Sequence, residues 1–331
     1  MPRIIHVSGN SEQRGKQLGE IWRDDMQNAF AAWSQHFNEL GHDADQIAQR
    51  LSQSVAWDLA EKHTPEIVTE LKATAQSSGL DWKIISALAL LDESWAATGG
   101  AACTAIAITR PQNRSIGQNM DLPAWTNGFQ RVAVHEEPSG VKVGCVTYPG
   151  MPATCGANSS GLGLAVNALE HLPVQEAGVP VAFITRTVLS MTSAIEAAEF
   201  VRSIPHGVGQ SYMILDRTDL VRLEAAADGV VDLPTDGEIF GHSNHALGRA
   251  DQVSESSLLR LAAVESASDS ILNEKDVMSV LLDRESGVCM TAGRWNNNLY
   301  SFTGFVSNAN EGSLWVNLEP AGNGSYEQIL H

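Results

Sequence analysis

The spacing of apolar residues changes its period about a third of the way along the chain, at Cys103. Before that point apolar positions recur at helical spacing, and after it short apolar runs alternate with turns rich in Pro, Asn and Gly. A chain with this change must pack a block of helices against sheets built from its remaining residues. The sequence therefore predicts an α+β fold, in which blocks of strands alternate with pairs of helices.

The region 1–102 is expected to be mainly helical. Proline at the start of a helix and glycine just beyond its end are common signals, and Pro65 and Gly79 enclose the third predicted helix in this way. Asp81 is a suitable N-cap for the fourth, because its carboxylate can accept from the free amide groups of the first turn. The four helices are predicted at 12–30, 47–62, 65–79 and 81–91.

From Cys103 onward the pattern predicts two antiparallel sheets covered by helices. The turn Glu137–Gly140 between two apolar runs indicates a hairpin, and Ser193 with Glu196 forms a capping box at the start of a helix. Without an internal repeat or a linker, one compact body is expected. Strands are predicted at 104–109, 115–120, 131–136, 141–148, 161–167, 212–215, 220–226, 230–233, 288–291, 299–306 and 313–318, and helices at 180–191, 193–203, 254–267 and 274–283.

Composition excludes several classes of protein. Of the 331 residues 43% are hydrophobic and 18% charged, as expected for a soluble globular chain. No apolar run approaches the roughly 18–20 residues of a membrane span, and the N-terminus lacks the apolar core of a signal peptide. We therefore expect a cytoplasmic protein with no membrane partner. The net charge of −18 disfavours nucleic acid, which binds to basic surfaces.

The cysteines do not have the spacing of a disulfide framework or of a metal site, and most are expected to be small buried residues. Cys103 differs because the small residues Gly99–Ala102 precede it and an apolar strand follows it. Small residues allow close backbone approach and unusual dihedral angles. This arrangement suggests a nucleophilic thiol, which needs a base, a helix N-terminus or an amine to activate it. The four cysteines are Cys103, Cys145, Cys155 and Cys289.

Three other segments were weighed for chemistry. His242 and His245 are too few for a zinc site, so a polar turn is predicted there, although Asn244 between them could donate to an oxyanion. The glycine-rich segment 156–163 lacks the Lys-Ser/Thr of a phosphate loop and is predicted to be a turn between strands. Asp121 ends the strand beside that of Cys103, where it could orient an amine or cap the following turn. No metal and no cofactor are predicted.

Together these segments resemble the acyl-coenzyme A:6-aminopenicillanic acid acyltransferase family (isopenicillin N acyltransferase-like) of N-terminal nucleophile hydrolases. That family is related to choloylglycine hydrolases and penicillin V acylases. The resemblance extends over nearly the whole chain, and the order and spacing of its motifs carry it. The motifs are Glu12-Gln13-Arg14-Gly15 with Gly19, Glu70–Ala75, Cys103-Thr104, Gly117–Asp121, Gly156-Ala157-Asn158, Ala165-Val166-Asn167 and Ser243-Asn244-His245.

The resemblance implies a four-layer αββα sandwich and a precursor that cleaves itself between Ala102 and Cys103. Residues 1–102 would become an α chain and 103–331 a β chain, which together form one compact α/β heterodimer; a homo-oligomer of it is left open. By this reading the thiol attacks the Ala102 carbonyl, and water then hydrolyses the thioester. The freed α-amino group, with an ordinary pKa of about 8, acts as general base for its own thiol.

The same resemblance implies the residue roles. Cys103 is the nucleophile, and Asp121 orients its amine or thiol. Asn244 is an oxyanion donor, and Asn167 is a second oxyanion or substrate contact. These four residues are the predicted catalytic set.

Two positions depart from the family pattern. Ala102 stands where glycine usually precedes the nucleophile, so slower cleavage is expected. Gln118 replaces an arginine that bile-salt and penicillin V hydrolases carry, so a charged contact near the nucleophile is missing. Arg294 is the candidate for the family's later active-site arginine. Substrate contacts are expected at Gln118, Thr104 and His245.

The sequence thus predicts a self-processing cysteine amidohydrolase that cleaves the non-peptide C–N bond of a small N-acylated amine through an S-acyl-enzyme. An acyltransferase that moves the acyl group from a thioester or amide donor to an amine is the alternative, because only the molecule that intercepts the acyl-enzyme differs. A further alternative is an unprocessed, non-catalytic binding protein. The acyl and amine parts of the substrate are not identified by the sequence.

Overall fold

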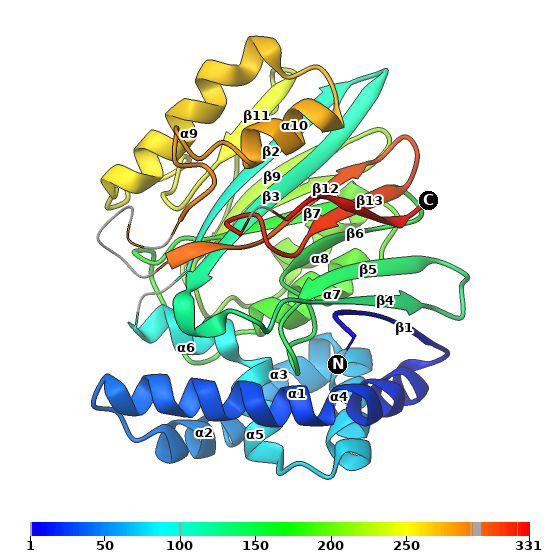
Figure 1. Cartoon of the computed structure of the whole chain (residues 1–331), viewed down its shortest axis with the longest axis vertical. Coiled ribbons are helices and arrows are strands. Elements are labelled where there is room, and N and C mark those ends of the chain that lie inside the picture. The colour runs from blue at the N-terminus through cyan, green and yellow to red at the C-terminus, as the bar shows by residue number, and fades with distance from the viewer. Residues whose placement is uncertain (1, 99–100, 292, 294–298, 323) are drawn as a thin grey trace.

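Two sheets lie face to face in the computed structural model, with helices on their outer sides (Figure 1). The eight-stranded sheet has the order β1-β4-β5-β6-β7-β8-β9-β10, and the six-stranded sheet has the order β11-β2-β3-β12-β13-β14. The predicted αββα sandwich is therefore confirmed. The structure describes residues 2–98, 101–291, 293, 299–322 and 324–331, with only the main chain of 95–98.

Neighbouring strands pair antiparallel except β1, which runs parallel to β4. The described strands are β1 (Ile4–Ser8), β2 (Ala102–Arg110), β3 (Asn113–Pro123), β4 (Arg131–Glu136), β5 (Lys142–Thr147), β6 (Cys155–Asn158), β7 (Gly163–Ala168), β8 (Gln210–Leu215), β9 (Leu220–Ala226), β10 (Gly229–Asp232), β11 (Ile239–His242), β12 (Leu299–Asn308), β13 (Ser313–Asn317) and β14 (Glu327–Leu330). The described helices are α1 (Ser11–Glu39), α2 (Ala44–Ser52), α3 (Ala56–His63), α4 (Pro65–Ser78), α5 (Trp82–Ala89), α6 (Leu91–Thr98), α7 (Val181–Leu189), α8 (Ala194–Ser203), α9 (Glu255–Ala267) and α10 (Glu274–Leu281).

Several sequence predictions of secondary structure are wrong. The helix expected at 47–62 is two helices, α2 and α3, and between them the Ser54 hydroxyl accepts from the Ala56 main-chain N–H. The segment 288–291 is not a strand; its backbone is bent and irregular, although Val288, Cys289 and Met290 are buried. The strands β1, β6, β11 and β14 were missed because each has only four or five residues. β6 includes part of the segment 156–163, of which only the centre is a turn.

Strand β2 is buried on both faces because its sheet lies between the other sheet and the helices α9 and α10. Ala105 packs in the apolar layer between the sheets, whereas Ile106 packs against Val264 of α9. Side chains alternate along a strand. Cys103 therefore faces the layer between the sheets, and Thr104 faces α9.

The helices α1 to α5 form a layer of their own below the sandwich in Figure 1, and α4 contacts α7. Two glycines allow α1 to approach α4 closely. A Cβ at Gly15 would lie 2.0 Å from the main-chain oxygen of Glu70, and one at Gly19 would lie 2.5 Å from that of Thr74. Two motifs that suggested the family, around Gly15 and around Glu70, thus meet at one helix contact.

Replacing Gly15 by Ala is expected to lower the free energy of unfolding by about 1–3 kcal/mol, because a main-chain carbonyl cannot rotate away from the new methyl group. Urea unfolding of the full chain measures this change. Gly237→Ala is the control, since a Cβ there would lie 3.4 Å from the Phe240 ring, an ordinary contact. The control is expected to change stability by less than about 0.5 kcal/mol. Equal stability of the two variants would contradict the proposed close contact.

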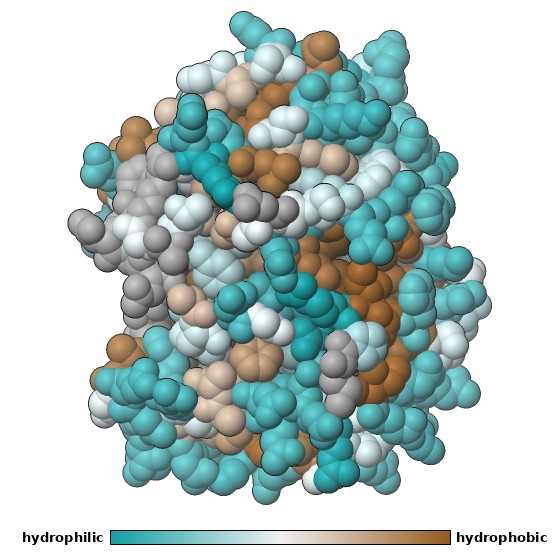
Figure 2. Space-filling view, in the orientation of Figure 1, coloured by the Kyte–Doolittle hydropathy of each residue, from teal (hydrophilic) through white to brown (hydrophobic). Residues whose placement is uncertain are grey.

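The surface mixes hydrophilic side chains with smaller apolar areas (Figure 2). Large apolar side chains that are more than two-fifths exposed include Leu247, Val253, Leu258 and Leu259, which lie on α9 or in the loop before it. In the part of the chain that the structure describes, every helix is too short or too polar to cross a bilayer.

Candidate active site

Cys103 lies near the start of β2 and is 5% exposed. Its main-chain N–H donates to the side-chain oxygen of Asn244 over 2.8 Å, and its carbonyl accepts from the guanidinium group of Arg260. The pairing of β2 with β3 places Asp121 opposite Ala102. The predicted cleavage junction is therefore held by elements from three separate parts of the sequence.

Asp121 presents one free carboxylate oxygen. Its Oδ1 accepts from the Ser301 hydroxyl over 2.6 Å, whereas Oδ2 is buried without a hydrogen bond to any described residue. Burial raises the pKa of Asp121 to about 6, although the Arg260 charge and the Ser301 hydrogen bond lower it. Above pH 6 this carboxylate is therefore mostly ionised, with one oxygen available to take a proton.

The thiol of Cys103 is protonated in the intact chain at neutral pH. Burial is the main cause that raises its pKa to about 12, and the Asp121 carboxylate adds to that rise. A hydrogen bond from Gln118 and the charge of Arg260 lower it in part. Attack by this thiol therefore requires a base.

Asn244, just after β11, contacts Cys103 through its side-chain oxygen. Its Nδ2 donates to the carbonyl of Ala168 over 3.0 Å, and its main-chain N–H donates to the Ser257 hydroxyl over 2.8 Å. The side-chain Nδ2 of Asn244 is thus bonded to a main-chain carbonyl in the intact protein, and its main-chain N–H to a side-chain hydroxyl. Its role as an oxyanion donor stays a prediction.

Asn167 lies on β7 in the facing sheet and is buried. Its Nδ2 donates to the carbonyl of His242 over 3.3 Å, and its Oδ1 has no hydrogen bond to a described residue. This bond links β7 to the strand that precedes Asn244. The structure thus brings both asparagines to the same end of the sandwich as Cys103, and the catalytic role of Asn167 stays a prediction.

Arg260 is the residue that the sequence interpretation missed. It is 1% exposed on α9 and donates to Asn244 Oδ1 over 2.8 Å and to Thr104 Oγ1 over 2.9 Å, besides the Cys103 carbonyl. It shares the buried face of α9 with Ser257 and Val264, but the exposed Leu258 and Leu259 hide this face in the sequence. Arg294, the sequence candidate for an active-site arginine, lies outside the described residues.

The three predicted substrate contacts are engaged inside the protein. Gln118 accepts from the main-chain N–H of Val166 over 3.0 Å and donates to its carbonyl, which joins β3 to β7 across the two sheets. Thr104 accepts from Arg260, and the His245 ring lies 2.7 Å from the Ser257 hydroxyl. These bonds position the active-site strands, while contact with a substrate stays a prediction.

The polar turn predicted around His242 is confirmed. The His242 ring lies 2.9 Å from the Ser243 carbonyl and 3.0 Å from the Glu224 carboxylate, and that carboxylate also accepts from the main-chain N–H of Leu247 and Gly248. Desolvation lowers the pKa of His245 and favours its neutral form. The two histidines therefore fix the turn that carries Asn244. In the described part of the chain no three His, Cys, Asp or Glu residues gather in a metal-binding cluster.

The sequence of 108–319 matches the profile of the acyl-coenzyme A:6-aminopenicillanic acid acyl-transferases. The chain belongs to this family. The matched segment includes Asp121, Asn167, Asn244 and Arg260, and it begins shortly after Cys103. The resemblance seen in the sequence is therefore confirmed. None of the curated proteins matches the chain.

Solved structures similar to this acyl-transferase family member include those of three enzymes. A Caenorhabditis elegans N-acylethanolamine-hydrolyzing acid amidase ortholog is 14% identical, with a TM-score of 0.46, over 62% of this chain and 91% of that one. A variant of the conjugated bile acid hydrolase of Clostridium perfringens is 12% identical, with a TM-score of 0.45, over 69% and 92%. The penicillin V acylase of Agrobacterium tumefaciens is 14% identical, with a TM-score of 0.38, over 69% and 86%. Identities this low do not bear on substrate.

In this acyl-transferase family member, the groups that surround the Ala102–Cys103 bond suit nucleophilic acyl transfer. The thiol is the predicted nucleophile, and the Asp121 carboxylate is close enough to raise its pKa. The Arg260 guanidinium places a positive charge at this bond, and Asn167 and Asn244 lie at the same end of the sandwich, where an oxyanion-donor role for their amides stays a prediction. A free amine at Cys103 would form only through the predicted cleavage.

Proposed function

We propose that this chain is a self-processing cysteine amidohydrolase that cleaves the C–N bond of a small N-acylated amine through an S-acyl-enzyme at Cys103. The observation that carries this proposal is the arrangement around the junction. Asn244 and Arg260 hold the main chain of Cys103, and Asp121 lies opposite Ala102 with a free oxygen. The family of acyl-transferases to which the chain belongs agrees with such chemistry.

The first reaction is cleavage of the chain itself. The Cys103 sulfur attacks the carbonyl carbon of Ala102, and the thiol proton passes to the free oxygen of Asp121. The C–N bond then breaks, the nitrogen of Cys103 takes a proton to become an amine, and a thioester remains. Water hydrolyses this thioester, which leaves a carboxylate on Ala102 and restores the thiol.

The second reaction acts on the substrate. The new α-amino group, with an ordinary pKa of about 8, takes the proton of the adjacent thiol. The thiolate attacks the substrate carbonyl, the amine part leaves with a proton, and water releases the acyl group from sulfur. Asn244 and Asn167 are the proposed oxyanion donors, and loss of one such donor typically costs ~10²–10³ in rate.

The two fragments are expected to stay together after cleavage. Strand β1 of the α segment is paired with β4 of the β segment. Asp25 of α1 forms a buried ion pair with Arg131 of β4, with 2.8 Å between nitrogen and oxygen. Separation would expose both the unpaired strand edge and the buried charges. We therefore propose a stable α/β heterodimer.

Acyl transfer to an amine is the second candidate, and the name of the matched family favours it. The acyl-enzyme is the same, and an amine replaces water in the last step. Hydrolysis stands first because transfer requires a site that holds the amine and excludes water. Supplying an acyl thioester together with an amine separates the two, since a transferase forms the new amide faster than the free acid.

Intact mass under denaturing conditions tests the proposal. Freshly purified protein is expected to give two fragments, 1–102 and 103–331, that elute as one species in native chromatography. Fragments that meet elsewhere would contradict Cys103 as the nucleophile. A single chain that stays whole on incubation would favour the unprocessed binding protein instead.

A further inference from the structure

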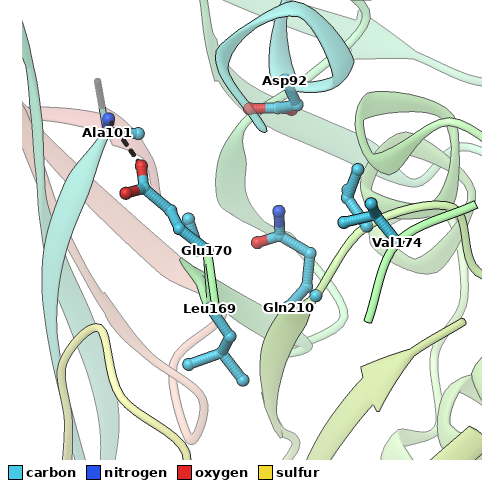
Figure 3. Close-up of a pocket in the computed structure, with 9 residues that line it drawn as sticks. Asp92, Ala101, Leu169, Glu170, Val174 and Gln210 are labelled. Carbon is cyan, nitrogen blue, oxygen red and sulfur yellow. Dashed lines mark hydrogen bonds between the residues drawn. The ribbon is translucent and has the colours of Figure 1, made fainter. Parts of the chain in front are cut away.

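The main chain on both sides of the predicted scissile bond is held by side chains. On one side the Glu170 carboxylate accepts from the Ala101 N–H over 3.4 Å (Figure 3). On the other side the Asn244 side-chain oxygen accepts from the Cys103 N–H over 2.8 Å. Proton transfer takes place only over hydrogen-bond distances, so the proposed base, Asp121, must be placed with similar accuracy. A group that fixes its carboxylate is therefore expected.

Ser301 stands opposite Asp121 because strand β12 contains an extra residue. From Thr303 onward β12 pairs with β3 in one register, in which Thr303 is opposite Met120. If that register continued, Phe302 would be opposite Asp121. The register instead shifts by one residue, and Ser301 takes that place. The irregularity thus puts a hydroxyl group instead of an aromatic ring beside the carboxylate, and bulges next to active sites often redirect a side chain in this way.

The hydrogen bonds of Ser301 fix the direction of its hydroxyl proton. The residue is fully buried, and its Oγ accepts from the main-chain N–H of Met290 over 2.8 Å. Its own main-chain N–H donates to the Met290 carbonyl over 2.9 Å, so two bonds tie Ser301 to this residue. A hydroxyl group has a single hydrogen. That hydrogen is directed to Asp121 Oδ1, 2.6 Å away, and Oδ2 is left without a bond to any described residue.

The charged and titratable groups around Asp121 come from three other elements. They are Cys103 on β2, Arg260 on α9 and Cys289 in the segment before β12. Burial raises the pKa of both thiols, so each is uncharged at neutral pH. The Cys289 thiol also lies within hydrogen-bond reach of Ser301, and in its protonated form it donates to a lone pair of that oxygen. The hydroxyl proton of Ser301 thus stays with Asp121.

We propose that Ser301 is a positioning residue for self-cleavage, whose hydroxyl holds Oδ1 of Asp121 and thereby leaves Oδ2 as the oxygen that takes the Cys103 proton. This assignment rests on the proposed function, in which Asp121 is the base. Without the hydroxyl, no described residue would donate to the carboxylate. The group would then be free to turn, and its charged form would lose the hydrogen bond that favours it.

Ser301→Ala tests the assignment in the Cys103→Ala chain, which is expected to stay intact. Carbon-13 NMR of labelled aspartate follows the ionisation of Asp121, and the signal is identified by its absence in Asp121→Asn. With Ser301 present, Asp121 is expected to titrate near its pKa of about 6. Without the hydroxyl it should titrate at a pH higher by about one or more, because a hydrogen bond to the charged form lowers the pKa.

Self-cleavage gives the second readout, measured as intact mass against time in the Cys103→Ser chain, which is expected to cleave slowly. Ser301→Ala should lower the rate at neutral pH by about tenfold or more. The pH below which cleavage slows should rise together with the titration of Asp121. If the Cys103→Ser chain is inert, Ser301→Ala with the natural thiol is expected to be isolated partly uncleaved.

Ser307→Ala is the matched control. Ser307 lies on the same strand and is fully buried, and its hydroxyl has no hydrogen bond to a described residue. Its replacement removes the same atom from β12 without touching Asp121. The control should move neither the titration of Asp121 nor the pH dependence of cleavage.

The outcomes separate this inference from the proposed function. If Ser301→Ala leaves the titration of Asp121 unmoved, or if Ser307→Ala moves it equally, Ser301 does not hold the carboxylate, whatever the cleavage rates. If the titration moves while cleavage keeps its rate and pH dependence, Ser301 has no part in self-cleavage, and the proposed function stands. A wild-type chain that never cleaves itself would overturn the proposed function and the role of Ser301 together.

Discussion

The Cys103→Ala chain is expected to remain a single polypeptide of 331 residues and to hydrolyse no amide. The thiol is the attacking atom in self-cleavage and again in turnover, so its removal leaves no nucleophile for either step. Intact mass after long incubation measures the first effect, and turnover of an amide that the wild type cleaves measures the second. The loss should be complete in both.

Cys145→Ala is the matched control, because Cys145 is another fully buried free cysteine and lies on β5, outside the proposed active site. This variant is expected to cleave itself and to turn over substrate. If Cys103→Ala still hydrolyses the substrate, the proposed mechanism is wrong. If the Cys103→Ala chain still cleaves itself after Ala102, a group other than this thiol attacks the Ala102 carbonyl.

The contact between the cleavage junction and Asp121 was the most predictable part of the site. β2 and β3 form a hairpin whose turn lies between Arg110 and Asn113, so their pairing is local in sequence. The apolar run after Cys103 marks one strand, and Asp121 ends the next. A change of period followed by a short polar turn is enough to bring such residues together.

The contacts of Asn244 and Arg260 were not predictable in the same way. They join Cys103 to residues 141 and 157 positions away in the chain. They depend on where β11 and α9 pack, and β11 has only four residues, too short for a periodic signal. The resemblance to a family suggested Asn244, whereas Arg260 became visible only when α9 was placed on the sheet.

Gln118 shows how a departure from a family pattern acquires a physical reason. The sequence indicates only that a charge is missing where related hydrolases carry an arginine. In the structure the amide binds both main-chain groups of Val166, which an arginine, having no acceptor, cannot do. The residue thus joins the two sheets behind the nucleophile.

Replacing Arg260 by Met is expected to slow both self-cleavage and turnover by about 10²-fold or more, because the positions of Asn244 and of the Cys103 main chain both depend on it.

Arg260 also lowers the pKa of Asp121. Since the ionised carboxylate is the proposed base, wild-type self-cleavage should fall below about pH 6, and this limb of the pH profile should move to higher pH in the variant. Cys103→Ser is expected to cleave itself slowly, and mass time courses in this background measure the rate and its pH dependence.

Two further variants separate charge from geometry. Arg260→Lys keeps the positive charge but loses the planar set of N–H donors of the guanidinium group. The pH below which self-cleavage slows (the acid limb of the pH profile) should therefore stay near that of the wild type, while the rate falls. Arg222→Met removes another buried arginine, which donates to the main-chain oxygens of Pro234 and Gly241, and should leave the acid limb unmoved. If Arg260→Met keeps both the wild-type rate and the wild-type limb, Arg260 only holds α9 on the sheet. An acid limb that moves in Arg260→Met alone would show that its charge acts on Asp121.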